Sequence, residues 1–204
     1  MKAFDKNEKQ YLNKMFMEKG KELFSMYGIK KTSIEDLTKS VGIAKGSFYT
    51  FFNSKEELYF KIMSEEIKNL AKENIMTLDR EKPVKEIIKS FLINAIKEIH
   101  SNPILNKLLV PGEFELVRRK MATVNSGDNT DFLGPMIMLL SKLQKEGLII
   151  EIHPLLMANI IRGLLLLSTH KREIGEDYFD EVIQFYVDML AEKLTDVKGQ
   201  NKGK

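Results

Sequence analysis

Residues 32–58 hold the side chains whose types and spacing could do chemistry. Two short helices fit this stretch, from about residue 33 to 41 and from about residue 44 to 51, and Gly42 lies between them, where a tight turn needs a positive φ. Such a pair is a helix-turn-helix. The outward side of the second helix is predicted to present polar groups and a positive charge without a carboxylate, through Lys45, Gly46, Ser47, Tyr49 and Thr50. These groups suit contacts with the phosphates and base edges of a nucleic acid.

Each of these residues also has an ordinary structural interpretation. Lys45 could reach a phosphate or the O6/N7 edge of guanine, or it could simply be solvated. Gly46 would let a duplex approach the backbone closely, or it is only a weak helix position. The hydroxyls of Ser47 and Tyr49 could bind phosphate or base, whereas a tyrosine in a small domain often packs half-buried. Thr50 either faces the groove of a duplex or packs at its edge.

The flanks of the motif are predicted from helical spacing and capping patterns. Apolar residues at helical spacing, together with Phe48 and Phe52, would form the small core. Residues 32–35 have the spacing of a capping box, so the main role expected of their hydroxyls is to cap the helix. The free N–H groups at the start of that helix would also suit a phosphate. A second box is predicted at residues 54–57. Lys55 would lie in the first turn of that helix, where the dipole disfavours a cation and a nearby phosphate would explain it.

The motif resembles the N-terminal DNA-binding domain of the TetR family of transcriptional regulators. The resemblance covers about a quarter of the chain and rests on Thr32-Ser33, on Gly42-Ile43-Ala44-Lys45-Gly46-Ser47-Phe48-Tyr49 and on Phe52-Asn53-Ser54-Lys55-Glu56-Glu57-Leu58. It implies contacts with double-stranded DNA by Thr32, Ser33, Lys45, Gly46, Ser47, Tyr49, Thr50 and Lys55. Ala44 departs from the family pattern, because a serine or threonine usually caps the recognition helix there, and a cap is worth ~1 kcal/mol.

The rest of the chain also predicts helices. They are expected at about residues 7–27, 54–78, 84–101, 105–110, 113–121, 132–147, 154–170 and 176–194, with breaks at glycine, proline or polar runs. No stretch alternates at period two for long enough to require a sheet, so the predicted fold is all-α. We expect a DNA-binding domain at 1–60, a helical ligand-binding and dimerisation domain at 61–197 and a basic disordered tail at 198–204.

The last two helices predict an oligomer. The helix at about 154–170 has almost no polar face, and the one at about 176–194 carries two overlapping apolar stripes. A helix that is apolar all round must be covered on all sides. These helices therefore predict a C2 homodimer built as a four-helix bundle, which the family resemblance also implies. Paired recognition helices would then read a palindromic operator.

The resemblance further implies a small-molecule pocket in the second domain, whose ligand releases the protein from its operator, most often as a repressor. Candidate lining residues are Phe91, Met121, Phe132, Met136, Met157, Ile161, Arg162 and Leu165. The alternative for the apolar members is ordinary core. Arg162 could pair with an anionic ligand or with an acidic side chain of the fold. Few charged groups are available, so the ligand would be largely apolar.

Composition excludes several other classes of protein. The chain has 204 residues, 43% of them hydrophobic, and no cysteine, which excludes disulfides and thiolate-bound metal. Its apolar stretches are shorter than a membrane span needs, so we expect a cytoplasmic protein without a membrane partner. The three histidines lack metal-ligand spacing, and no phosphate loop or nucleophile elbow occurs; we predict no cofactor, metal or catalytic residue. The competing hypothesis is a helical ligand-binding or interaction protein that keeps the fold without operator specificity.

Overall fold

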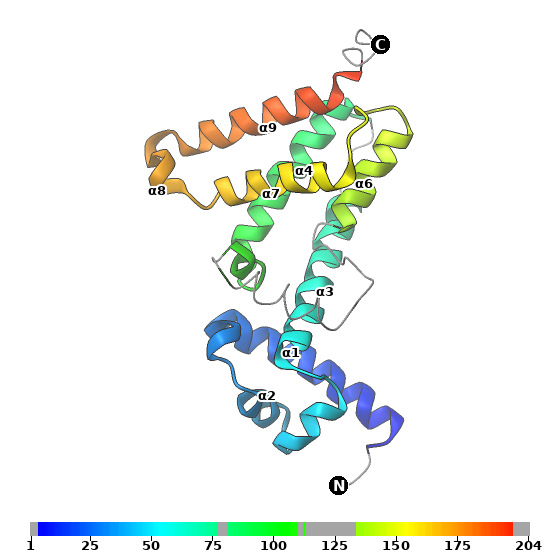
Figure 1. The fold of residues 1–204 in the computed structure, drawn as a ribbon, viewed down its shortest axis with the longest axis vertical. Coiled ribbons are helices and arrows are strands. Elements are labelled where there is room, and N and C mark those ends of the chain that lie inside the picture. The colour runs from blue at the N-terminus through cyan, green and yellow to red at the C-terminus, as the bar shows by residue number, and fades with distance from the viewer. Residues whose placement is uncertain (1–3, 77–80, 110–111, 113–133, 198–204) are drawn as a thin grey trace. The chain divides into compact units, whose positions relative to one another are not determined.

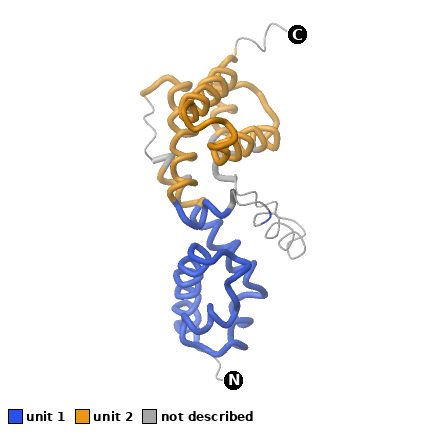
Figure 2. The backbone as a smooth tube through the Cα atoms, turned by 90° about the vertical axis from the view of Figure 1, so that its left-hand side faces the viewer, with its two compact units in different colours: residues 1–66, 102–129 blue, residues 67–101, 130–204 orange. Residues whose placement is uncertain are grey.

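The computed structural model describes residues 4–76, 81–109, 112 and 134–197. All regular structure in these ranges is helical, so the fold is all-α as predicted (Figure 1). The chain divides into two compact units, residues 1–66 with 102–129 and residues 67–101 with 130–204 (Figure 2). The division at residue 66 falls within helix α3 (Lys55–Met76). The segment that begins at Asn102 groups with the N-terminal unit.

The first helix of unit 1, α1 (Lys6–Lys31), is longer than predicted. It begins with a capping box between Asp5 and Glu8. The predicted stop at Gly28 is a kink instead, with φ 75° and ψ 167°, and one more helical turn follows it. Glycine adopts a positive φ at little cost, which is why the kink lies at this residue.

Unit 1 continues with α2 (Ile34–Val41), the short helix η1 (Lys45–Thr50), the first half of α3 and the short helix η2 (Leu105–Leu109). Its core is aromatic. The ring of Phe16 meets those of Phe48 and Phe52 edge-on, with centroids 5.4 and 5.6 Å apart, and all three side chains are buried. The prediction that Phe48 and Phe52 belong to the core is therefore confirmed.

A close approach of α1 and α3 depends on Gly20. A Cβ atom at this position would lie 2.9 Å from Cδ1 of Ile62 and 3.2 Å from Cδ2 of Leu58. Contacts this short force the neighbouring side chains to move. Gly20 therefore lets the two helices pack more closely than any larger residue would allow.

Unit 2 holds most of the remaining helices. They are α4 (Val84–Ser101), α6 (Gly134–Lys145), α7 (Pro154–Leu167), α8 (Lys171–Ile174), η3 (Glu176–Tyr178) and α9 (Phe179–Thr195). The bounds of α4 are the predicted ones, while α8 was not predicted. Helices α4 and α9 pack together, and Lys89 on α4 lies 2.7 Å from Asp188 on α9. The hydrogen bond from Lys89 lowers the pKa of the Asp188 carboxyl.

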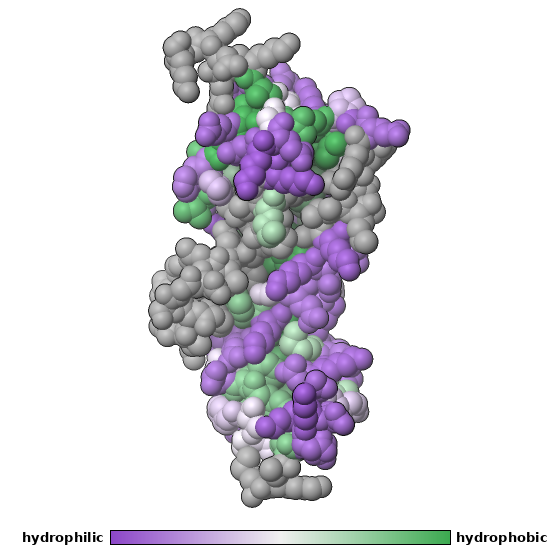
Figure 3. Space-filling model, turned by 90° about the vertical axis from the view of Figure 1, so that its right-hand side faces the viewer, coloured by the Kyte–Doolittle hydropathy of each residue, from purple (hydrophilic) through white to green (hydrophobic). Residues whose placement is uncertain are grey.

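Helices α7 and α9 keep apolar side chains in solvent. Their buried sides carry Met157, Ile161, Leu164, Leu165, Val187, Ala191 and Leu194. Their exposed apolar side chains include Leu155, Leu156, Leu166, Phe185 and Met189, which are 43–66% exposed. We call these five residues the apolar face. Figure 3 shows how apolar surface interrupts the hydrophilic surface on the side of the molecule in view.

Candidate nucleic-acid interface

The turn between α2 and η1 has the predicted glycine geometry. Gly42 has φ 80° and ψ 28°, which is the left-handed conformation, and its N–H donates to the carbonyls of Lys39 and Thr38. The next residue, Ile43, donates its N–H to the carbonyl of Thr38 at 3.0 Å. The helix-turn-helix therefore closes on backbone hydrogen bonds that a residue with a Cβ atom would disfavour at position 42.

The capping box of α2 lies one residue later than predicted. Ser33 is the N-cap, and its hydroxyl accepts from the N–H of Asp36 at 3.1 Å. The Asp36 carboxylate in turn accepts from the N–H of Ser33 at 2.9 Å and from its hydroxyl. These bonds lower the pKa of Asp36. Some of the backbone N–H groups at the N-terminus of α2 thus already have hydrogen-bond acceptors within the protein. Two carboxylates, Glu35 and Asp36, lie in the first turn of this helix.

The recognition segment is a 3₁₀ helix, η1, where an α-helix was predicted. Its hydrogen bonds run from residue i+3 back to residue i, as from the N–H of Ser47 to the carbonyl of Ala44 at 2.9 Å. Ala44 is the N-cap residue of η1, and its side chain forms no capping hydrogen bond, as its residue type predicts. A short, uncapped segment that contains a glycine gains little from α-helical cooperativity, and 3₁₀ geometry is common in such pieces.

Four candidate residues on η1 are open to solvent: Lys45, Gly46, Tyr49 and Thr50. The side chain of Tyr49 is 60% exposed, so the half-buried packing role does not apply to it. Ser47, by contrast, is only 8% exposed. An exposed polar edge on a segment anchored by buried phenylalanines can approach a duplex without unpacking the core.

Thr32 has a structural role. It is 1% exposed, and its hydroxyl donates to the carbonyl of Gly28 at 2.9 Å. The hydroxyl also lies 3.4 Å from the carbonyl of Leu23. The expectation that the Thr32 hydroxyl caps α2 is therefore corrected, because Ser33 is the N-cap and the Thr32 side chain folds back on the end of α1.

Lys55 also differs from the expectation. Its Nζ donates to the carbonyl of Ile29 at 2.7 Å and to that of Thr32 at 2.8 Å. A cation is favourable beside the free carbonyls at a helix C-terminus. The end of α1 thus explains a lysine in the first turn of α3, and no phosphate is needed to account for it. The predicted box at the start of α3 is present in modified form: Ser54 accepts from Glu57, and Glu57 reaches back to Asn53.

Sequence reasoning missed Glu35. Its carboxylate lies 3.0 Å from Nζ of Lys39 and 3.8 Å from Nζ of Lys45. The hydrogen bond from Lys39 and the charges of both lysines lower the pKa of Glu35. The spacing of Glu35 and Lys39 on one helix signals the first contact. The second depends on how the turn folds α2 against η1, which the sequence does not reveal.

Four of the eight effector candidates lie in the core of unit 2. Phe91, Met157, Ile161 and Leu165 are 1–7% exposed, as the alternative interpretation of ordinary core predicts. Arg162 donates to the side chain of Asn159 on its own helix at 2.7 Å. Met121 and Phe132 lie outside the described residues. Met136 lies in α6, but its side chain is not among the described parts of the structure.

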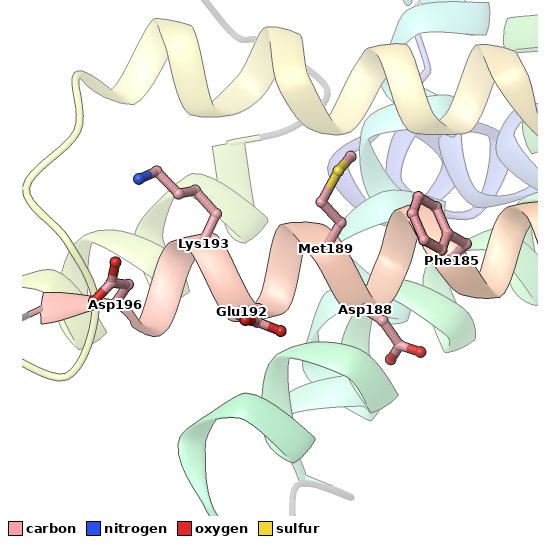
Figure 4. Close-up of a pocket in the computed structure, with 6 residues that line it drawn as sticks. All are labelled: Phe185, Asp188, Met189, Glu192, Lys193 and Asp196. Carbon is pink, nitrogen blue, oxygen red and sulfur yellow. The ribbon is translucent and has the colours of Figure 1, made fainter. Parts of the chain in front are cut away.

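A surface hollow of about 440 Å³ lies along α9 (Figure 4). It is lined by Phe185, Asp188, Met189, Glu192, Lys193 and Asp196. None of the predicted effector residues lines it. Asp188 and Glu192 are already paired with Lys89 and Lys85 of α4.

The described ranges contain no group of acidic or histidine side chains that could hold a metal, and no helix in them could cross a membrane. The three histidines occupy helix ends. His100 lies in the last turn of α4, His153 caps α7 and His170 precedes α8.

Comparison with known proteins places the helix-turn-helix in a family context. The family model described as "Bacterial regulatory proteins, tetR family" matches residues 16–62. The uncharacterized HTH-type transcriptional regulator YhgD of Bacillus subtilis is 33% identical over 57 residues, which is 28% of this chain and 30% of that protein. The matched segment thus spans less than a third of this relative.

Solved structures share the fold over nearly the whole chain. RolR in complex with the ligand resorcinol superposes with a TM-score of 0.66 at 14% identity, covering 95% of each chain. The fatty acid degradation regulator FadR of Bacillus halodurans superposes with a TM-score of 0.61 at 17% identity, covering 93% of this chain and 96% of its own. At these identities the likeness concerns the fold.

Proposed function

We propose that this chain, whose residues 16–62 match the TetR family model, is a DNA-binding transcriptional regulator that binds a palindromic operator as a homodimer. The exposed edge of η1 carries this proposal. Lys45 and Tyr49 project from a segment that Phe48 and Phe52 hold in the core. We assign DNA contacts to Lys45, Gly46, Tyr49 and Thr50, with Ser33 beside them at the start of α2. Ser47 and Lys55 would contribute chiefly by holding the motif together.

The homodimer would form through the apolar face of α7 and α9. Five apolar side chains exposed by 43–66% on two helices are a large area to leave in water, and such patches mark interaction sites. A twofold axis would bury the same face on both copies. It would also present two recognition segments to successive major grooves, whose centres lie a helical turn of ~34 Å or a small multiple apart.

Sedimentation velocity tests the dimer. The wild-type protein should sediment as a dimer at micromolar concentration, while Leu166→Glu combined with Met189→Glu should give a folded monomer, because the glutamates place charge in an apolar contact. Leu148→Glu provides a matched control, since Leu148 is also exposed (39%) but lies outside both helices. A monomeric wild type would refute the dimer.

A small, largely apolar effector would regulate DNA binding and release the protein as a repressor. RolR, which shares the fold, binds resorcinol, a small aromatic molecule. The buried side chains of Phe91, Met157, Ile161 and Leu165 offer an apolar interior in unit 2. Arg162, which is bonded to Asn159, would be the one charged candidate among these described residues.

Fluorescence anisotropy with duplexes tiling the DNA around the protein's own gene tests operator binding. One palindromic duplex should bind most tightly, with an affinity that falls as salt rises. Lys45→Ala combined with Tyr49→Ala should abolish this preference. The matched control is Lys14→Ala with Tyr11→Ala, which removes from α1 a lysine and a tyrosine that are at least as exposed as Lys45 and Tyr49.

The uncapped 3₁₀ geometry of η1 favours a second candidate, a helical ligand-binding or interaction protein without operator specificity. Weak and equal binding to every duplex, unchanged by the double substitution at residues 45 and 49, would support it against the regulator. A candidate small molecule that binds without altering DNA affinity would argue against the effector role in either case.

A further inference from the structure

One carboxylate connects the two helices of the DNA-binding motif. Oε1 of Glu35, in the first turn of α2, lies 3.0 Å from Nζ of Lys39, and its Oε2 lies 3.8 Å from Nζ of Lys45, the first residue of η1. The side chains of Glu35 and Lys45 are 51% and 63% exposed. An acceptor and a donor of opposite charge thus stand side by side at the edge proposed to meet DNA.

Glu35 differs from its neighbour Asp36, whose carboxylate is turned back to cap α2 through Ser33. In the described part of the chain, the Glu35 carboxylate is paired with the two lysines instead. The Lys39 hydrogen bond lowers the pKa of Glu35, so the side chain is ionised near neutral pH and can only accept hydrogen bonds. Lys45 can only donate.

We propose that Glu35 and Lys45 together read one C·G base pair in the major groove, an inference that rests on the proposed DNA-binding function. Guanine offers two adjacent acceptors, N7 and O6, and the paired cytosine offers the N4 amino donor. O6 and N4 are joined by a base-pair hydrogen bond of ~2.9 Å. Nζ of Lys45 would bind the guanine acceptors, and Oε2 of Glu35 would accept from cytosine N4. These two protein atoms lie 3.8 Å apart, which is close to the separation of O6 and N4.

The pattern discriminates against the other base pairs. With adenine in the place of guanine, the lysine would face the N6 donor and the carboxylate would face the O4 acceptor of thymine, so both contacts are lost. With thymine in the place of guanine, O4 and adenine N6 keep the acceptor and the donor, so the preference for C·G rests on the lost N7 acceptor and on the thymine methyl group beside the ammonium. Reversing C·G to G·C would bring the carboxylate against guanine acceptors. On unmatched DNA the carboxylate is left facing acceptors and phosphates, which lowers the affinity for wrong sequences.

Selection from a randomised duplex pool, followed by sequencing, tests the inference. The wild-type protein should enrich a palindrome with C·G at one symmetric position. Glu35→Gln should enrich the same palindrome with the preference at that position reduced by roughly fivefold or more, and Lys45→Gln should relax the same position. Glu35→Gln should also bind a scrambled duplex roughly two- to fivefold more tightly, because an exposed charge pair and a phosphate-repelling carboxylate are lost.

Glu22→Gln is the matched control, since it makes the same change in charge on an exposed residue of α1 paired with Lys19. It should leave every position of the selected site unchanged. The inference is overturned if Glu35→Gln keeps the full wild-type preference, or if Glu35→Gln and Lys45→Gln relax different positions. Failure of wild type to enrich any sequence would overturn the proposed DNA-binding function, and the inference with it.

Discussion

Replacing Lys55 with methionine separates two roles for this residue, support of the fold and contact with phosphate. Methionine keeps most of the aliphatic stem and removes the ammonium. The carbonyls of Ile29 and Thr32 would then lose a donor that now lies 2.7 and 2.8 Å away. These two bonds tie the start of α3 to the end of α1, so their loss should lower the stability of unit 1.

The magnitude follows from three contributions. Hydrogen bonds to charged groups contribute about 1.5–3 kcal/mol each. Because both bonds share one half-buried ammonium, the lower end applies, or about 3 kcal/mol for the pair. Removing a cation from the first turn of α3 returns about 0.3–1 kcal/mol. Lys55→Met should therefore lower the free energy of unfolding by about 2 kcal/mol.

Urea unfolding followed by circular dichroism measures this change in the free energy of unfolding. Lys9→Met, at an exposed lysine of α1, is the control, and its free energy of unfolding should lie within about 0.5 kcal/mol of the wild-type value. The salt dependence of DNA binding supplies the second readout. Unchanged stability together with a salt slope reduced by ~0.9, the value for one phosphate contact, would refute the structural role and restore the phosphate contact.

Three further substitutions test the site locally. Ala44→Ser should supply the missing cap of η1 and raise the free energy of unfolding by about 0.5–1 kcal/mol in urea titrations; no change would show that a cap cannot form in this turn. Gly46→Ala meets no atom within 4 Å in the free protein, so stability should be unchanged or higher by up to ~1 kcal/mol, while anisotropy should show weaker DNA binding. Unweakened binding would contradict a close backbone approach. Burial raises the pKa of Glu57, but hydrogen bonds from Lys61 and Asn53 outweigh it, and the net shift is downward. Glu57 therefore stabilises the fold above its ordinary pKa of 4.5, and this stabilisation is lost as pH falls through the lower folded-state value; Glu57→Gln should flatten the acid decline measured by urea unfolding, and an identical decline would contradict this.

The sequence by itself indicated most of the described helices and the position of the motif. Residues 84–101 repeat their apolar side chains at helical spacing, and the structure has α4 at these residues. Gly42 was predicted to adopt a positive φ because only glycine does so at little cost, and it has φ 80°. Phe48 and Phe52 were assigned to the core from their spacing, and both are buried. Such features depend on residues within a turn or two of one another, which the sequence lists in order.

The tertiary structure decided which polar groups are free to meet a ligand. Thr32 looked like a cap, but its hydroxyl is buried against the end of α1. Lys55 bonds to carbonyls 26 and 23 residues away. Glu35 meets Lys45 only because the turn at Gly42 brings α2 against η1. A side chain's partner is set by which backbone and charged groups surround it after packing, and residues far apart in sequence supply them. Residue types thus indicated where chemistry could occur, and packing selected the groups available for it.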